Sequence, residues 1–182
     1  YTAFKGQADA LLGDERPLEA IPLYGQARDI AEEPWQVGWA GLGLAMALKE
    51  SDDTEGAVTM LDELILHSDE EVRLEATLRR SQIASEAEDW ATAIRVLNPR
   101  DAVDLGPAWD ASATNARARA LVGAGDVDGA TASWRALANR WPGEEEAELP
   151  AWLGLAQLAM DFGQNKDAHH WARKAFKEAR DP

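Results

Sequence analysis

The stretch GAGDVDGATASW, residues 123–134, decides the fold of this chain. Its glycines, Gly123 and Gly125, can take the left-handed backbone conformation that ends a helix, and Asp126 can cap the next one. Ala130 is small enough to let two helices approach closely, and Trp134 lies one helical turn further along on the same face. The stretch therefore predicts a helix, a tight turn and a second helix.

The same pattern occurs five times along the chain. The other copies are GDERPLEAIPLY (13–24), SDDTEGAVTML (51–61), EAEDWATAIRVL (86–97) and FGQNKDAHHWA (162–172). Each copy contains an anchoring alanine, and the separations between successive ones are 37, 36, 37 and 38 residues: Ala20, Ala57, Ala93, Ala130 and Ala168. We expect the residue four positions later to share the buried face; these residues are Tyr24, Leu61, Leu97, Trp134 and Ala172.

This period predicts an all-α solenoid of about five antiparallel helix pairs. A pair this short cannot bury its apolar face alone, so stacking must supply the core. We expect one repeat domain over residues 1–182, with units at about 1–34, 35–69, 70–106, 107–143 and 148–182. Because the chain starts with Tyr1 inside a helical pattern, we expect it to be a piece of a longer protein.

Composition restricts the possible partners. The chain has 33 acidic and 18 basic residues, for a net charge of −15, so nucleic acid and anionic membrane surfaces are unfavourable partners. This charge serves solubility or a basic partner. There is no cysteine, which excludes a disulfide or a thiolate metal site. No apolar run approaches the roughly 18 residues that a membrane-spanning helix needs.

We find no residue pattern typical of catalysis, a cofactor or a metal ion. His169 and His170 are adjacent and point about 100° apart on a helix, so they cannot chelate one ion in the usual way. His67 fits a solvated or capping residue better than a ligand. Acidic clusters such as Asp52-Asp53 fall at helix starts, where they favour the helix dipole. No phosphate-binding or nucleophile motif is present.

The units resemble the tetratricopeptide-repeat (TPR) family. The first unit has the residues of the family pattern at Phe4, Ala8, Leu11, Ala20, Tyr24 and Ala27, the fourth at Ala118, Leu121, Ala130, Trp134, Leu137 and Pro142, and the fifth at Trp152, Leu155, Ala156, Ala159, Ala168 and Ala175. The third unit matches at Ala93 and Leu97. In the second unit, either Trp39, Leu42, Gly43 and Met46 or Leu44, Ala45 and Leu48 are the equivalents.

The repeat is longer than the usual family period of about 34 residues. The extra residues fall in links such as NRWPGEEEAELPAW (139–152). This layout resembles bacterial cell-envelope TPR proteins, so we expect a periplasmic or envelope location rather than a cytoplasmic one.

The resemblance also implies a right-handed solenoid with a protein-binding groove, lined by the first helix of each pair. Carried onto this chain, its positions are Lys5, Asp9, Trp39, Leu42, Met46, Lys49, Leu78, Gln82, Asn115, Arg119, Leu153 and Gln157. Asn115 and Arg119 are the best candidates to hold a peptide backbone or a carboxylate, the alternative being a solvated face.

The function expected from this resemblance is a non-catalytic scaffold that binds a peptide or a partner protein. The alternatives are a structural array that self-associates through its N-terminal end, and a regulatory segment of a larger protein.

The chain also contains eight tryptophans. We expect Trp39, Trp134 and Trp152 to lie in the core, and exposed anchors to be found among those near the links: Trp35, Trp109 and Trp141.

Overall fold

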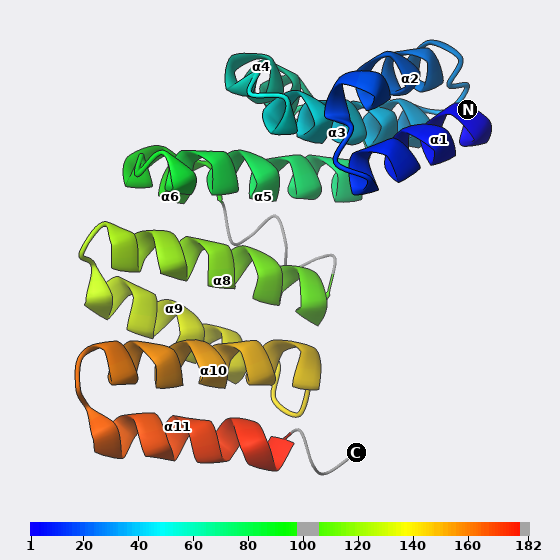
Figure 1. The fold of residues 1–182 in the computed structure, drawn as a ribbon. Helices are drawn as coiled ribbons and strands as arrows, with labels where there is room; N and C mark the ends of the chain where they lie inside the picture. Colours follow the sequence, from blue (N-terminus) through cyan, green and yellow to red (C-terminus); the bar gives the residue numbers. More distant parts are fainter. Residues whose placement is uncertain (98–105, 179–182) are drawn as a thin grey trace. The chain divides into compact units, whose positions relative to one another are not determined.

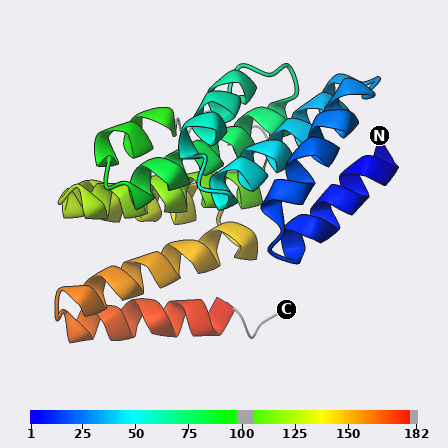
Figure 2. The same cartoon turned by 45° about the horizontal axis from the view of Figure 1, so that its top comes forward.

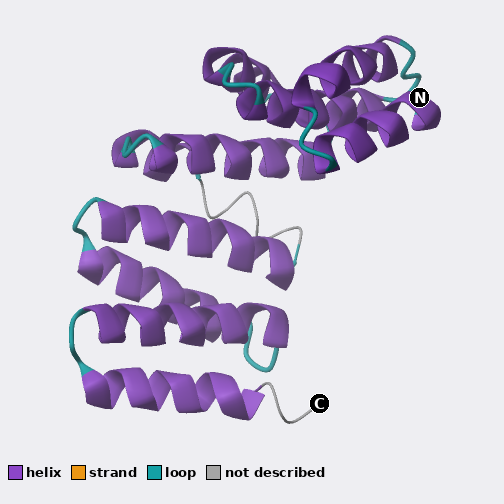
Figure 3. Cartoon of the chain, viewed as in Figure 1, coloured by secondary structure: helices purple, strands orange, loops and turns teal. Residues whose placement is uncertain are grey.

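The computed structural model describes residues 1–97 and 106–178. These ranges contain ten helices and no strand (Figure 3). The helices are α1 (Thr2–Gly13), α2 (Pro17–Asp29), α3 (Pro34–Glu50), α4 (Thr54–Leu64), α5 (Glu70–Glu86), α6 (Trp90–Val96), α8 (Pro107–Gly123), α9 (Val127–Arg140), α10 (Glu145–Asp161) and α11 (Asn165–Glu178) (Figure 1). The all-α class of paired helices predicted from the repeats is confirmed.

The chain forms two compact units, Tyr1–Ile83 and Ala84–Pro182, whose boundary falls inside α5. We call them the N-terminal and the C-terminal unit. In the N-terminal unit α3 contacts α1, α2 and α4. In the C-terminal unit α10 contacts α8, α9 and α11, and both views show α10 and α11 lying side by side (Figures 1 and 2).

Five three-residue turns join the paired helices, and all five have the same backbone geometry. The middle residue of each has a positive φ: Glu15 (58°), Asp52 (68°), Glu88 (57°), Gly125 (82°) and Gly163 (67°). In the fourth turn the N–H of Gly125 donates to the carbonyl of Val122, and the N–H of Asp126 donates to that of Leu121, each at 2.9 Å. This is the Schellman arrangement, which satisfies carbonyls that the helix end leaves free.

The first turn departs from the sequence prediction in one detail. The first copy of the pattern starts with Gly13, and a glycine after a helix can take the left-handed conformation that ends it. Gly13 is instead the last residue of α1, and Glu15 takes the left-handed position. The turn places this position two residues beyond the helix end, regardless of where the glycine lies. Three of the five turns thus hold an acidic residue in a conformation that favours glycine.

An aspartate at the end of three turns starts the following helix. The Asp126 side chain accepts a hydrogen bond from the N–H of Gly129 at 2.9 Å. Asp53 and Asp89 form the same bond in their own turns. Each bond satisfies one of the free N–H groups at a helix start. The capping role predicted for Asp126 is confirmed.

The five anchoring alanines are all buried, as the repeat predicts. The residue four positions after the anchoring alanine is also buried in four units, at Tyr24, Leu61, Leu97 and Trp134. The fifth prediction is wrong, because Ala172 is exposed. In α11 the adjacent Trp171 packs instead, stacked on Trp152 of α10 with ring centroids 5.4 Å apart.

Glycines on the first helix of a pair make room for a large ring from the preceding helix. A Cβ atom at Gly43 would lie 2.2 Å from the Tyr24 ring, and one at Gly154 would lie 2.3 Å from the Trp134 ring. Each glycine lies eight residues before the first residue of its own turn, Ser51 or Phe162. Gly43 and Gly154 are therefore equivalent, which makes Leu44, Ala45 and Leu48 the family equivalents in the second unit.

Candidate protein-binding groove

A pocket of about 540 Å³ lies between α8, α9 and α10 of the C-terminal unit. We call it the α8–α10 pocket. Four of the residues predicted from the sequence line it together: Asn115, Arg119, Leu153 and Gln157. The other lining residues are Val122, Trp134, Leu149, Pro150, Gly154, Leu158 and Asp161. The two first helices α8 and α10 therefore bring predicted positions of two neighbouring repeats to one concave site.

Trp134 of α9 supports the floor of the pocket. It is buried, and its ring packs against Gly154 because that glycine has no side chain. The indole N–H donates to Oδ1 of Asn115 at 3.2 Å. A buried indole N–H needs an acceptor, so this bond both satisfies Trp134 and holds the Asn115 side chain in one orientation. Trp134, predicted only as a core residue, is thus also part of the site.

One wall of the pocket is aliphatic. Leu149 and Leu153 lie four residues apart on α10 and therefore share a face, with Pro150 beside them. Val122 of α8 is a further apolar lining residue. The Leu153 side chain is 52% exposed. The wall offers apolar surface that a partner side chain can remove from water.

Polar groups of α8 and α10 also line the pocket. The Nε2 atom of Gln157 donates to Oδ1 of Asp161 at 2.7 Å, one turn further along α10. Arg119 of α8 is exposed and has no ion pair or hydrogen bond with any residue in 1–97 or 106–178. The pocket therefore combines aliphatic surface with one cation, one anion and two amides.

In the N-terminal unit, the predicted pair Lys5 and Asp9 is part of a structural contact. Lys5 Nζ lies 2.7 Å from Oδ2 of Asp9, and the hydroxyl of Tyr24 donates to Oδ1 of Asp9, also at 2.7 Å. Burial, followed by this hydrogen bond, raises the pKa of Tyr24 above its ordinary value. Both carboxylate oxygens of Asp9 are thus engaged within the unit.

The predicted groove residues of α3 are less available than expected. Leu42 is only 5% exposed and shares a buried cluster with Leu61, Leu64 and Val72. The prediction that Leu42 faces a partner is therefore wrong, since its surface is already covered within the unit. Trp39, expected in the core, is half-buried and packs against the same cluster.

The remaining predicted groove residues lie on α3 and α5. Met46 and Lys49 of α3 are half-buried, as is Leu78 of α5, whereas Gln82 of α5 is exposed. The structure thus places these four side chains at the surface of the helices that the sequence predicted, outside the α8–α10 pocket.

The C-terminal unit also contains a buried carboxylate that the sequence did not single out. Asp110 of α8 is fully buried and accepts hydrogen bonds from Thr114 (3.2 Å), from the indole N–H of Trp141 (2.7 Å) and from Arg140. Trp141, considered above as an exposed anchor, is instead half-buried and bound to Asp110. The sequence did contain a signal for Asp110, because it is an acidic residue on the apolar side of a predicted helix.

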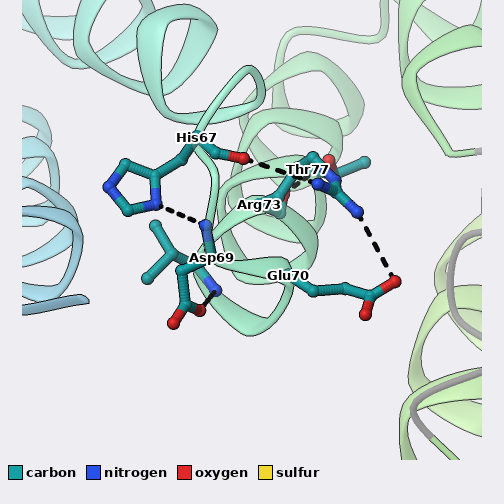
Figure 4. A network of polar contacts seen from close by, with 6 residues as sticks. His67, Asp69, Glu70, Arg73 and Thr77 are labelled. Atoms are coloured by element: carbon teal, nitrogen blue, oxygen red, sulfur yellow. Dashed lines mark hydrogen bonds and ion pairs between the residues drawn. The ribbon is translucent and has the colours of Figure 1, made fainter. Parts of the chain in front are cut away.

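His67 has a capping role between α4 and α5 (Figure 4). Its Nδ1 accepts the N–H of Asp69 at 3.0 Å, and its carbonyl accepts a bond from Arg73. Asp69 in turn accepts the N–H of Val72, as a helix cap does.

Across residues 1–97 and 106–178, no three His, Cys, Asp or Glu side chains gather closely enough to hold a metal ion. No helix in those ranges combines the length and apolar character of a membrane span.

Comparisons with known proteins identify the fold. No protein-family model matches the chain, and no curated protein matches it. Among solved structures, the chain is similar to a Podosopora anserina protein described as a kinesin light chain with nearly identical TPR-like repeats, at 16% identity and a TM-score of 0.73, covering 97% of this chain and 93% of that one.

MamA proteins are also similar. A fragment of MamA from Desulfovibrio magneticus RS-1 matches at 19% identity and a TM-score of 0.63, covering 98% of this chain and 94% of that one. A double mutant of MamA RS-1 matches at 20% identity with the same score and coverage. At these identities the likeness shows the fold alone. The chain has the TPR-like helical-repeat fold that its five recurring turns predict.

Proposed function

We propose that this chain is a non-catalytic scaffold whose α8–α10 pocket binds a peptide segment of a partner protein. The supporting observation is the pocket itself, which joins equivalent positions of two neighbouring repeats. A volume of about 540 Å³ lies in the range typical of ligand sites and is large enough to hold side chains of a bound segment.

The distribution of chemistry in the pocket also supports a peptide. A segment of protein presents alternating backbone donors and acceptors together with side chains of several kinds. The pocket offers an aliphatic wall of Leu149 and Leu153 and polar groups from Asn115, Arg119 and Gln157. Burying exposed Leu153 gives a favourable apolar term, and the polar groups set the register of the bound chain.

Site-specific photo-crosslinking tests this proposal. A photoreactive benzophenone amino acid in place of Leu153 is compared with the same group in place of Leu18, which is 73% exposed on α2, outside the pocket. In a lysate of the source organism, we expect illumination to attach another polypeptide at position 153 and not at position 18. Leu149→Gln, which removes part of the wall, should lower the yield at position 153.

Equal adducts from both positions, or a yield that Leu149→Gln leaves unchanged, would rule out the pocket as the binding site. An adduct consisting of two copies of this chain would instead favour the self-associating array. The cell-envelope location expected from the repeat spacing stays a prediction.

A further inference from the structure

The orientations of the two pocket amides are fixed by their partners. The indole N–H of Trp134 can only donate, so Asn115 must turn its oxygen toward it. The carboxylate of Asp161 can only accept, so Gln157 must turn its nitrogen toward it. Neither amide has a further hydrogen bond with a described residue. The nitrogen of Asn115 therefore remains as a donor and the oxygen of Gln157 as an acceptor.

A free donor on α8 and a free acceptor on α10 match the two polar groups of a peptide unit. Asn115 can donate to a carbonyl, and Gln157 can accept from an N–H group. A residue of a bound peptide offers both groups. The arrangement thus fits the backbone of a bound peptide segment.

Arg119 supplies the charge preference. It lies one turn from Asn115 on α8 and is a lining residue of the pocket. The chain has 33 acidic and 18 basic residues, yet Arg119 has no ion pair with any described residue. A guanidinium pairs most strongly with a carboxylate, with which it forms charge-assisted hydrogen bonds. An acidic side chain of a ligand would supply such a carboxylate.

We infer that the α8–α10 pocket selects a peptide segment in which an aliphatic side chain lies close to an Asp or Glu. The aliphatic side chain packs on Leu149 and Leu153, the backbone bonds to Asn115 and Gln157, and the acidic side chain pairs with Arg119. This inference rests on the proposed function and adds the chemistry of the ligand to it.

Selection from a peptide library tests the inference. The probe is a random library of ten-residue peptides, acetylated and amidated so that any carboxylate must come from a side chain. On the unmodified chain we expect Asp or Glu to be enriched within about four positions of Leu, Ile, Val or Met. With Arg119→Gln the acidic enrichment should disappear, and the best peptide should bind about tenfold more weakly, as for loss of a hydrogen bond to a charged group.

The chain offers a matched control on the same helix. Arg117 is an arginine of α8 outside the pocket lining, so Arg117→Gln should leave the selected peptides unchanged. Leu153→Gln should remove the aliphatic preference and weaken binding by roughly tenfold, the loss expected for an unburied leucine. All three variants change side chains that are exposed or half-buried. A thermal melt that matches that of the unmodified chain confirms that each variant is folded.

The outcomes separate the two proposals. Acidic enrichment that persists in Arg119→Gln, or that is lost equally in Arg117→Gln, overturns the inference and leaves the peptide-binding function standing. A second library with free C-termini yielding much tighter, end-dependent binders also overturns it. If no peptide is enriched, or if Leu153→Gln has no effect on those that are, the proposed function itself fails.

Discussion

Replacing Gly43 by alanine tests the close contact between the Tyr24 ring of α2 and the backbone of α3 at Gly43. Gly43 lies within α3, where alanine is intrinsically better than glycine by about 1 kcal/mol. A Cβ there would lie 2.2, 2.6 and 2.7 Å from the Tyr24 atoms Cε1, Cζ and Cδ1, whereas unstrained carbon contacts lie at roughly 3.5–4.0 Å. The ring would have to move by more than an ångström.

Tyr24 has little room for that movement. Its side chain is 1% exposed, and its hydroxyl is held by Asp9 at 2.7 Å. Overpacking of a buried site costs about 1–3 kcal/mol, and more when the neighbour is held. Since the Tyr24 ring is held, the cost here lies in the upper part of that range, at about 2–3 kcal/mol. After subtracting the gain of about 1 kcal/mol in helix propensity, we expect Gly43→Ala to lower the free energy of unfolding by about 1–2 kcal/mol.

Gly6→Ala is the matched control in the same unit. Gly6 lies within α1, and a Cβ there would meet no heavy atom within 4 Å. It should stabilise the chain by up to about 1 kcal/mol. Urea unfolding followed by circular dichroism measures both variants. In a Tyr24→Leu background the cost of Gly43→Ala should shrink, as a double-mutant cycle reveals. Equal stability of Gly43→Ala and Gly6→Ala would refute the role of the close contact.

Three further predictions concern the turns, the buried acid and the buried tyrosine. Glu88→Gly should raise the free energy of unfolding by up to about 1 kcal/mol in urea titrations, because φ is 57° there; a loss would show that the Glu88 side chain stabilises the turn. Asp110→Ala should lower the free energy of unfolding by about 2–3 kcal/mol, since Trp141 and Arg140 lose a buried acceptor. An unchanged melt would contradict this expectation. Because the pKa of Tyr24 is raised in the folded chain, the unfolded chain releases its proton first, so stability should fall as pH rises above about 10. Tyr24→Phe should lessen this fall of stability with pH. An identical pH profile of stability in the two proteins would contradict the role of Tyr24.

The α8–α10 pocket was only partly predictable. Asn115, Arg119, Leu153 and Gln157 were placed by carrying the groove positions implied by the TPR resemblance onto the repeat register, and they line one pocket. The register is a local property, because the distance from each turn fixes the face of the helix on which a residue lies. Sequence reasoning missed Asp161 as a lining residue, because the local pattern does not distinguish a pocket-facing aspartate at a helix end from a solvated one.

Equivalent positions show where local reasoning stops. Leu42 and Leu153 both lie nine residues before the turn that ends their helix, at Ser51 and Phe162. Leu42 is 5% exposed and Leu153 is 52% exposed. The register assigns both to the same face, but the volumes of side chains on neighbouring helices decide whether that face is covered. Those neighbours are distant in the sequence, so no local pattern contains the answer.

The sequence by itself determined the helices, their reversals and the repeat, because glycines, capping aspartates and small alanines act within a few residues of their own position. Only the tertiary structure decided which polar groups are already paired. Trp134 bonds to Asn115 across 19 residues, and Trp141 bonds to Asp110 across 31. Hydrogen bonds of this range depend on how the helices pack, and that packing leaves Arg119 without a partner among the described residues.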